Sequence, residues 1–256
     1  MRSGDGTAPY FAVHEGYALY RGPVSDSVAH RHAAFQIAIA LGGEVSMLDA
    51  GRIPHRAAAL VVPPMVWHRI LAVENLLTFF VEPHCAFADR LRARRGAGIT
   101  AAADLRDLRE QHVRGGGAHP SGDLDPRLQA AMRTLADQDA TRAPDSTATR
   151  PHATDSLPAL AAEVGLSPQR LRALARLQLG MPLSRWRIWV RLRRAAEAMR
   201  AGQSPAAAAI TGGFADQAHF TRRLREMMGL TPAAVAPLLR RSAAPGGVHR
   251  DGARDR

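Results

Sequence analysis

The stretch GFADQAHFTRRLREMMGLTP, Gly213–Pro232, combines two properties that one short helix rarely shows together. Phe220, Leu224 and Met227 recur at helical spacing, which is typical of a helix that packs against a core. Three arginines stand between them, so the opposite face is basic. We expect a helix that is buried along one face and presents positive charge along the other.

The positive charge of the chain is concentrated around this stretch. The 256 residues carry a formal net charge of +11. From Leu157 to Arg241 there are 14 arginines and four acids, whereas the rest has 20 arginines and 19 acids, which nearly cancel. Such a segment is typical of a module that binds nucleic acid, although a merely basic, soluble surface would have the same composition.

The basic segment contains the same helical unit twice. In the first copy a helix ends at Gly165, and Ser167-Pro168 supplies the N-cap and first turn of the next helix. In the second copy a helix ends at Gly213, 48 residues after Gly165, and Asp216 caps its successor. A helix of about five turns, PLSRWRIWVRLRRAAEAMRAG, joins the copies. The pattern predicts two helix-turn-helix units.

The second helix of each unit has an outward face that could read DNA. In the major groove, arginine and glutamine bond to guanine and adenine, and arginine also neutralises phosphates. The residues predicted to face outward are Gln169, Arg170, Arg172, Ala173 and Arg176 in the first unit, and Gln217, Ala218, Thr221, Arg222 and Arg225 in the second. The alternative is a basic helix that is exposed to solvent and has no nucleic-acid partner. The occurrence of two such helices in tandem makes this alternative less favoured.

The basic segment resembles the end of the AraC/XylS family of bacterial transcription regulators. The resemblance rests on Gly213-Phe214, His219-Phe220-Thr221-Arg222 and Gly229-Leu230-Thr231-Pro232, and LAAEVGLSPQRLRAL resembles the family's first unit. It implies two recognition helices in successive major grooves. The DNA-binding residues implied are Gln169, Arg170, Arg172, Ala173, Arg176, Gln217, Ala218, His219, Arg222 and Arg223. Ala173 and Ala218 have no side-chain hydrogen-bonding group, so they could contact only apolar groups of a base, such as a thymine methyl.

The first third of the chain is predicted to form short strands. Runs such as FQIAIAL, AALVV and LLTFFV, separated by glycine, proline and Asp-Ala-Gly turns, predict an antiparallel barrel or sandwich. After Pro83 the spacing becomes helical. These helices are expected either to pack on the barrel or to pair two subunits into a homodimer.

Two short motifs resemble those of cupin barrels, which the regulator family often places before its DNA-binding half. They are His30-Arg31-His32 with Gln36, and PPMVWH ending in His68. In metal-bearing cupins three histidines and a glutamate bind the ion, which makes His30, His32 and His68 possible ligands. Because Gln36 stands at the glutamate position, we predict no metal and no other cofactor.

Strand alternation gives a second reason to single out these residues. One face of the predicted strand carries large apolar side chains, and the other carries small or polar ones, namely His30, His32, Ala34, Gln36, Ala38 and Ala40. If the second face lines the barrel, His30, His32 and Gln36, with His68 from a later strand, would bind a small-molecule effector. In the reverse arrangement the histidines would face water.

These patterns predict an α+β chain of several domains. The expected parts are a cupin-like ligand-sensing antiparallel β-barrel (1–85), a helical extension that could form the dimer (86–138), a linker (139–156), an all-α domain of two helix-turn-helix units joined by a long helix (157–240), and a disordered tail (241–256).

The expected function is ligand-responsive, sequence-specific regulation of transcription, not enzymatic catalysis. The partners would be double-stranded promoter DNA, a small-molecule effector, and RNA polymerase if the protein activates. Two alternatives stay open: a metal-dependent cupin enzyme with a basic appendage, and a ligand-independent DNA binder. The lack of a long apolar run or signal-peptide core, and the single cysteine, Cys85, favour a cytoplasmic protein without a membrane partner.

Overall fold

The computed structural model describes residues 9–94, 96–115, 117, 121–141, 156–228 and 230–243. The strands are β1 (Tyr10–His14), β2 (Tyr17–Val24), β3 (Phe35–Ala40), β4 (Val45–Asp49), β5 (Pro54–Ala57), β6 (Ala59–Val62), β7 (His68–Ile70), β8 (Val73–Val81) and β9 (Thr100–Ala101). The helices are α1 (Ala86–Arg94), the 3-10 turn η1 (Ala103–Leu105), α2 (Glu110–Gly115), α3 (Pro126–Thr141), α4 (Leu157–Glu163), α5 (Pro168–Leu179), α6 (Leu183–Arg200), α7 (Pro205–Thr211), α8 (Gln217–Met228) and α9 (Pro232–Ala243).

The strands form two antiparallel sheets that face each other. The larger has the order β1-β2-β8-β3-β6-β9, and the smaller has the order β5-β4-β7. Ala38 and Ala40 of β3 pack against Val45 and Met47 of β4, in the core between the sheets. The small-residue face of β3 therefore points inward. This outcome confirms the orientation that strand alternation favoured.

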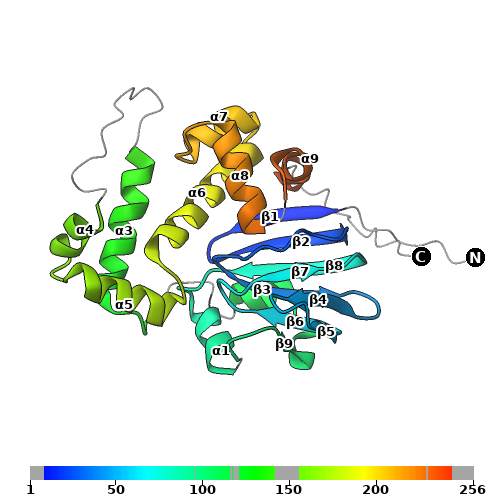
Figure 1. The fold of residues 1–256 in the computed structure, drawn as a ribbon. Helices are drawn as coiled ribbons and strands as arrows, with labels where there is room; N and C mark the ends of the chain where they lie inside the picture. Colours follow the sequence, from blue (N-terminus) through cyan, green and yellow to red (C-terminus); the bar gives the residue numbers. More distant parts are fainter. Residues whose placement is uncertain are drawn as a thin grey trace, which may run out of the picture.

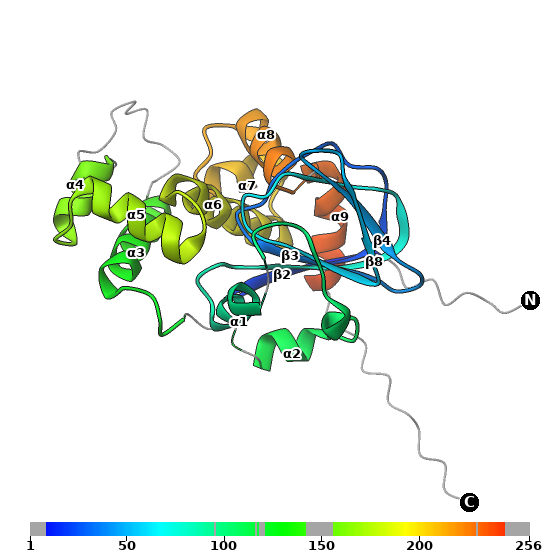
Figure 2. The ribbon, with the colours of Figure 1, turned by 60° about the horizontal axis from the view of Figure 1, so that its bottom comes forward.

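The opposite face of the larger sheet is covered by helices. Phe35, Ile37 and Ile39 share a core with Phe87 and Leu91 of α1. Figure 2 shows α1 and α2 on one side of the sheet, and α8 and α9 on the other. Large apolar side chains on this face of β3 thus hold the short helices that follow β8.

The helical half contains the two predicted helix-turn-helix units, α4–α5 and α7–α8, on either side of α6 (Figure 1). The hydroxyl of Ser167 accepts a hydrogen bond from the amide of Arg170 at 3.2 Å, and Asp216 Oδ1 accepts one from the amide of His219 at 2.6 Å. Gly165 and Gly213 have φ of 66° and 82°, which allows the chain to leave each first helix sharply. Side-chain caps and glycine stops therefore set the bounds of the units.

Helix α3 belongs to the helical half. Its apolar residues Leu128, Met132 and Leu135 lie in the same core as Leu160 of α4 and Leu174 of α5. Of the helices after Pro83, α1 and α2 pack on the sheet as expected, whereas α3 lies beside α4, α5 and α6 (Figure 1). The segment predicted as an extension of the barrel thus contributes to both halves.

Asp139 fixes α3 to α6. Its carboxylate is fully buried and accepts two hydrogen bonds from Arg191, at 2.9 and 2.6 Å, with further bonds from Arg187, the shortest at 2.7 Å. Burial acts to raise the pKa of Asp139, but the bonds from Arg191 and Arg187 outweigh it, and the pKa lies below the usual value. Two bidentate contacts offset the desolvation of the carboxylate.

The structure shifts two of the predicted boundaries. Helix α3 continues to Thr141, three residues into the predicted linker, because Asp139 is anchored in the core. Residues 142–155 lie outside the described residues. Helix α9 continues to Ala243, and the rest of the predicted tail, 244–256, also lies outside them.

The two halves share one apolar core. Phe11 of β1, Ala34 before β3 and Phe80 of β8 lie in the same cluster as Trp189 of α6 and Met228 of α8. Helix α9 packs on β1, as Figure 1 shows, and it also contacts α6. The smaller sheet does not cover one end of the larger sheet. Helices α6, α8 and α9 therefore close that end.

We predict that Asp139→Asn lowers the free energy of unfolding by about 3 kcal/mol, because two partly buried guanidinium groups lose their charged partner. Chemical denaturation of the full chain measures this loss. Asp107→Asn, which changes an exposed carboxylate after η1, is the matched control and should cost less than about 0.5 kcal/mol. Equal, small losses in both variants would contradict the assigned role of Asp139.

Candidate functional site

The predicted DNA-facing residues of the first unit all lie on the surface of α5. Leu171 and Leu174 are buried and hold the helix on its core. The other face is exposed over its full length and carries Gln169, Arg170, Arg172, Ala173 and Arg176. Leu177, at the end of this face, is 74% exposed, and periodicity alone did not single it out.

The predicted residues of the second unit are divided between surface and interior. Gln217, Ala218 and Arg222 are exposed on α8. Arg223 is half-buried and donates to Glu226 at 2.8 Å, a carboxylate that also accepts from Arg185 of α6 at 2.6 Å. Its guanidinium is therefore already bound within the protein.

His219 is also partly withdrawn. Its ring packs edge-on against Phe214, with centroids 5.4 Å apart. Burial, followed by the charges of Arg223 and Arg222, lowers the pKa of His219, so the ring is neutral near pH 7. Contact of His219 and Arg223 with DNA stays a prediction.

Not all of the arginine surplus is available to an outside partner. In α6, Arg185 binds Glu226, Arg187 and Arg191 bind Asp139, and Arg193 binds Glu82. By contrast, the exposed arginines of α5 and Arg222 of α8 form no ion pair with a carboxylate of the described residues. These unneutralised guanidinium groups are the ones suited to phosphates or base edges.

The four predicted effector residues come together at the end of the sheet covered by α8. The rings of His30, His32 and His68 lie with centroids 4.5–4.8 Å apart, and each residue is at most 5% exposed. Gln36 Oε1 lies 3.0 Å from His32 Nε2. His32 Nδ1 bonds to the backbone carbonyl of Met227, near the end of α8. A predicted sensor residue thus touches the helix predicted to read DNA.

Burial keeps these histidines neutral. It lowers the pKa of His68 to about 3, and it lowers the pKa of His32 well below its usual value, with added repulsion from its two histidine neighbours. Burial also lowers the pKa of His30. Each ring therefore keeps a lone pair at neutral pH, which a metal ion or a hydrogen-bond donor could use.

The three histidines fit a divalent metal ion such as Zn²⁺. Their ligand nitrogens lie within 4.8 Å of one another. The Nδ1 atoms of His30 and His68 lie 2.8 and 3.0 Å from the carbonyls of Val28 and Val66, which leaves Nε2 for an ion. The Nε2 atom of His68 is buried and has no hydrogen-bond partner among the described residues. The amide of Gln36 adds no negative charge to the cluster.

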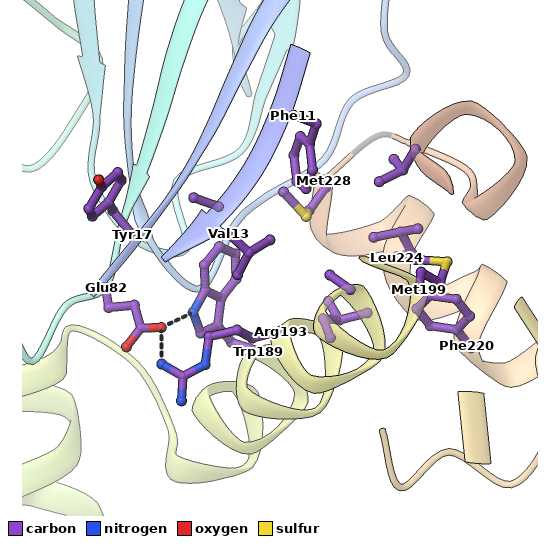
Figure 3. Close-up of a pocket in the computed structure, with 14 residues that line it drawn as sticks. Phe11, Val13, Tyr17, Glu82, Trp189, Arg193, Met199, Phe220, Leu224 and Met228 are labelled. Carbon is purple, nitrogen blue, oxygen red and sulfur yellow. Dashed lines mark hydrogen bonds and ion pairs between the residues drawn. The ribbon is translucent and has the colours of Figure 1, made fainter. Parts of the chain in front are cut away.

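A narrow cavity of about 30 Å³ lies where the larger sheet meets helices α6 and α8, and none of the four cluster residues lines it. Figure 3 shows its lining, which includes Phe11 and Val13 of β1 and Leu224 and Met228 of α8. Its polar lining residues include Glu82, which accepts hydrogen bonds from Trp189 Nε1 at 3.2 Å and Arg193 Nη1 at 2.9 Å. The space holds roughly one or two water molecules, so a larger ligand would have to move α8 or α6.

Sequence patterns did not point to the Met227 carbonyl or to Glu82. A backbone carbonyl has no sequence signal, because every residue carries one. Glu82 ends an apolar strand run, LLTFFV, and a carboxylate at such a position could have indicated a buried ion pair.

We predict that His32→Leu loosens the end of α8. The substitution leaves the Met227 carbonyl buried without its partner, which costs about 1–3 kcal/mol. Hydrogen exchange of the amides of Leu224–Met228 should quicken relative to wild type. His55→Leu, on β5 and away from α8, is the control and should leave exchange in α8 unchanged. Unaltered protection of α8 in the His32 variant would show that the contact does not hold the helix.

Comparison with known proteins connects this geometry to a family. Residues 160–236 match the family model of a helix-turn-helix domain. No curated protein sequence matches the chain. No helix of the described residues has the length and apolar character that crossing a membrane requires.

Solved structures of ToxT from Vibrio cholerae have the same fold over most of both chains. An apo variant superposes with a TM-score of 0.55 at 10% identity, covering 88% of this chain and 98% of ToxT. ToxT bound to an unsaturated fatty acid gives 0.54 at 11% identity, covering 94% and 98%. ToxT bound to a methylnaphthalenyl butenoic acid gives 0.52 at 12% identity, covering 88% and 99%. Residues 160–236 are therefore a helix-turn-helix domain of the AraC type, in a chain with the fold of ToxT.

Proposed function

We propose that this protein is a transcription regulator that binds promoter DNA sequence-specifically and responds to a small molecule. The observation that carries the proposal is the pair of exposed faces on α5 and α8, whose exposed arginines form no ion pair with a carboxylate in the part of the chain that the structure describes. They lie on the second helix of each unit of an AraC-type domain. A soluble basic surface would not require this repeated placement.

Arg172 and Arg222 are the best candidates for base readout. Both are exposed, and both lie in the first half of their helix, the part that meets base edges in helix-turn-helix proteins. Ala173 and Ala218, also exposed, would allow close approach or contact a thymine methyl. Arg170 and Arg176 would neutralise phosphates.

The proposed response to a small molecule depends on the contact between the barrel and α8. ToxT structures contain an unsaturated fatty acid or a butenoic acid, and this chain shares their fold. A ligand that entered the junction would disturb the bond between His32 and Met227 and so shift α8. Direct contact of the effector with His30, His32, Gln36 and His68 stays a prediction.

The histidine cluster gives the alternative of a metal-dependent cupin enzyme one observation in its favour. A catalytic metal needs an open coordination position that substrate can reach. The three rings are at most 5% exposed beneath α8, so an ion here would serve a structural role. A ligand-independent DNA binder is the other alternative, and the contact between barrel and α8 argues against it.

A homodimer, contact with RNA polymerase by an activator, and a cytoplasmic location are parts of the same proposal. A regulator that reads DNA must reach it in the cytoplasm of a bacterium, and pairing of two copies would double the contacted half-sites.

We predict that Arg172→Ala and Arg222→Ala each weaken binding to the cognate site by about 1–3 kcal/mol and relax base preference at one position. A mobility-shift titration of the full chain with its own upstream region, and with single-base variants, measures both effects. Arg200→Ala, an exposed arginine at the end of α6, is the matched control and should bind nearly as wild type. Losses that are equal on cognate and random DNA would assign both arginines to phosphates.

Salt dependence tests the electrostatic part separately. Wild-type affinity should fall steeply as salt rises, because arginine–phosphate contacts release counterions. Removing a residue that neutralises a phosphate makes the plot of log affinity against log salt concentration shallower by about 1. We expect this change in Arg176→Ala. An affinity for DNA that did not depend on salt would contradict the proposed interface.

A further inference from the structure

A second cavity, with a volume of about 250 Å³, lies between α3, α6 and the loop after β8. Its apolar walls include Leu124 and Met132 from the α3 region and Val190 from α6. It is separate from the histidine cluster, and it shares only Glu82 and Arg193 with the narrow cavity described above. Both halves of the molecule therefore contribute to its walls.

Three buried polar atoms of the residues that line this cavity have no hydrogen-bond partner among the described residues. They are Trp186 Nε1, Arg193 Nε and His84 Nδ1. Glu197 Oε1 lies 3.8 Å from Arg193 Nε, which is beyond hydrogen-bond distance. Buried polar groups are nearly always bonded, so three such atoms around one cavity indicate a missing partner.

The chemistry of the three atoms defines that partner. Trp186 and Arg193 can only donate, so they call for acceptor oxygens. Burial lowers the pKa of His84, and its Nε2 lies 3.2 Å from Glu82 Oε2. A neutral ring with its proton on Nε2, the atom that faces this carboxylate, has Nδ1 as an acceptor, which suits a hydroxyl group on the ligand.

The local charge favours an anion. The carboxylate of Glu82 is matched by the guanidinium of Arg193, at 2.9 Å. Arg133 lies exposed at the rim and adds one positive charge that no described carboxylate neutralises. The exposed carboxylate of Glu197 lies 3.8 Å from Arg193 Nε, too far to bond it, so the attraction for an anion comes from Arg133 and from the unbonded donors of Arg193 and Trp186.

We propose that this cavity binds a small, mostly apolar carboxylic acid. Its carboxylate accepts hydrogen bonds from Trp186 Nε1 and Arg193 Nε, and its apolar part lies against α3 and Val190. The site deepens the proposed function by naming a ligand class for the sensor, and only its effect on DNA rests on that function. Because α3 and the β8–α1 loop both line it, an occupant would link the two halves.

The test compares benzoate and hexanoate with their neutral amides, benzamide and hexanamide. Binding to the full chain is measured by isothermal titration calorimetry, and stability by thermal unfolding. Both acids should bind and raise the melting temperature, while the amides should bind at least about tenfold more weakly, because a charged acceptor gains more from buried donors. A hydroxyl beside the carboxylate, as in 2-hydroxybenzoate, should strengthen binding through His84.

Two tryptophan variants form a matched pair. Trp186→Phe keeps the ring and removes an N–H that has no partner, so it should leave stability unchanged and weaken benzoate about tenfold. Trp189→Phe removes an N–H that donates to Glu82, so it should lower stability while benzoate still binds.

Failure of both acids to bind the wild-type protein at millimolar concentration would overturn the proposal. Equal binding of acids and amides, or wild-type affinity for benzoate in Trp186→Phe, would overturn it as well. A mobility-shift assay with and without benzoate separates acid binding from DNA binding. If the protein binds the acid but does not bind DNA, only the proposed function is contradicted.

Discussion

Burial of one end of α8 against the open end of the sheet is the interaction on which the rest of the structure depends. Met227 and Met228 lie in the core that also contains Phe80 and Ala34, and the Met227 carbonyl bonds to His32. The exposed face of α8 is held in place by this contact. We therefore expect a change at this contact to shift α8 and, with it, Arg222, which is proposed to read DNA.

Two buried carboxylates attach the long helix α6 to its neighbours. Asp139 of α3 accepts from Arg187 and Arg191, and Glu82 after β8 accepts from Arg193 and Trp189. Desolvating such charges is costly unless the geometry is good, and here each carboxylate has at least two donors. The Glu82 contacts join α6 to the sheet, and the Asp139 contacts hold α3 on α6 within the helical half. They also leave donors of Trp186 and Arg193 unbonded beside a cavity, where an acid could complete them.

Much of the fold could be predicted from local sequence patterns. Capping residues such as Ser167 and Asp216, and glycine stops at Gly165 and Gly213, predicted both helix-turn-helix units, and alternation in β3 predicted its inward face. The exposed residues of α5 followed from the buried Leu171 and Leu174. Contacts between distant segments could not be predicted in this way. The surplus of positive charge suggested that the arginines of this segment bind DNA. Arg187 and Arg191 instead bind Asp139, which lies 48 and 52 residues away in the chain. The histidines were grouped correctly by motif, but their closure by a backbone carbonyl of α8 has no sequence signature.

The central claim is that the two-sheet half and the helical half, which contains α5 and α8, form one cooperative unit. Differential scanning calorimetry of the full chain tests it most directly. The shared core predicts one transition whose calorimetric enthalpy equals its van't Hoff enthalpy. Two separate transitions, or a calorimetric enthalpy well above the van't Hoff value, would contradict it, because the halves would then unfold independently.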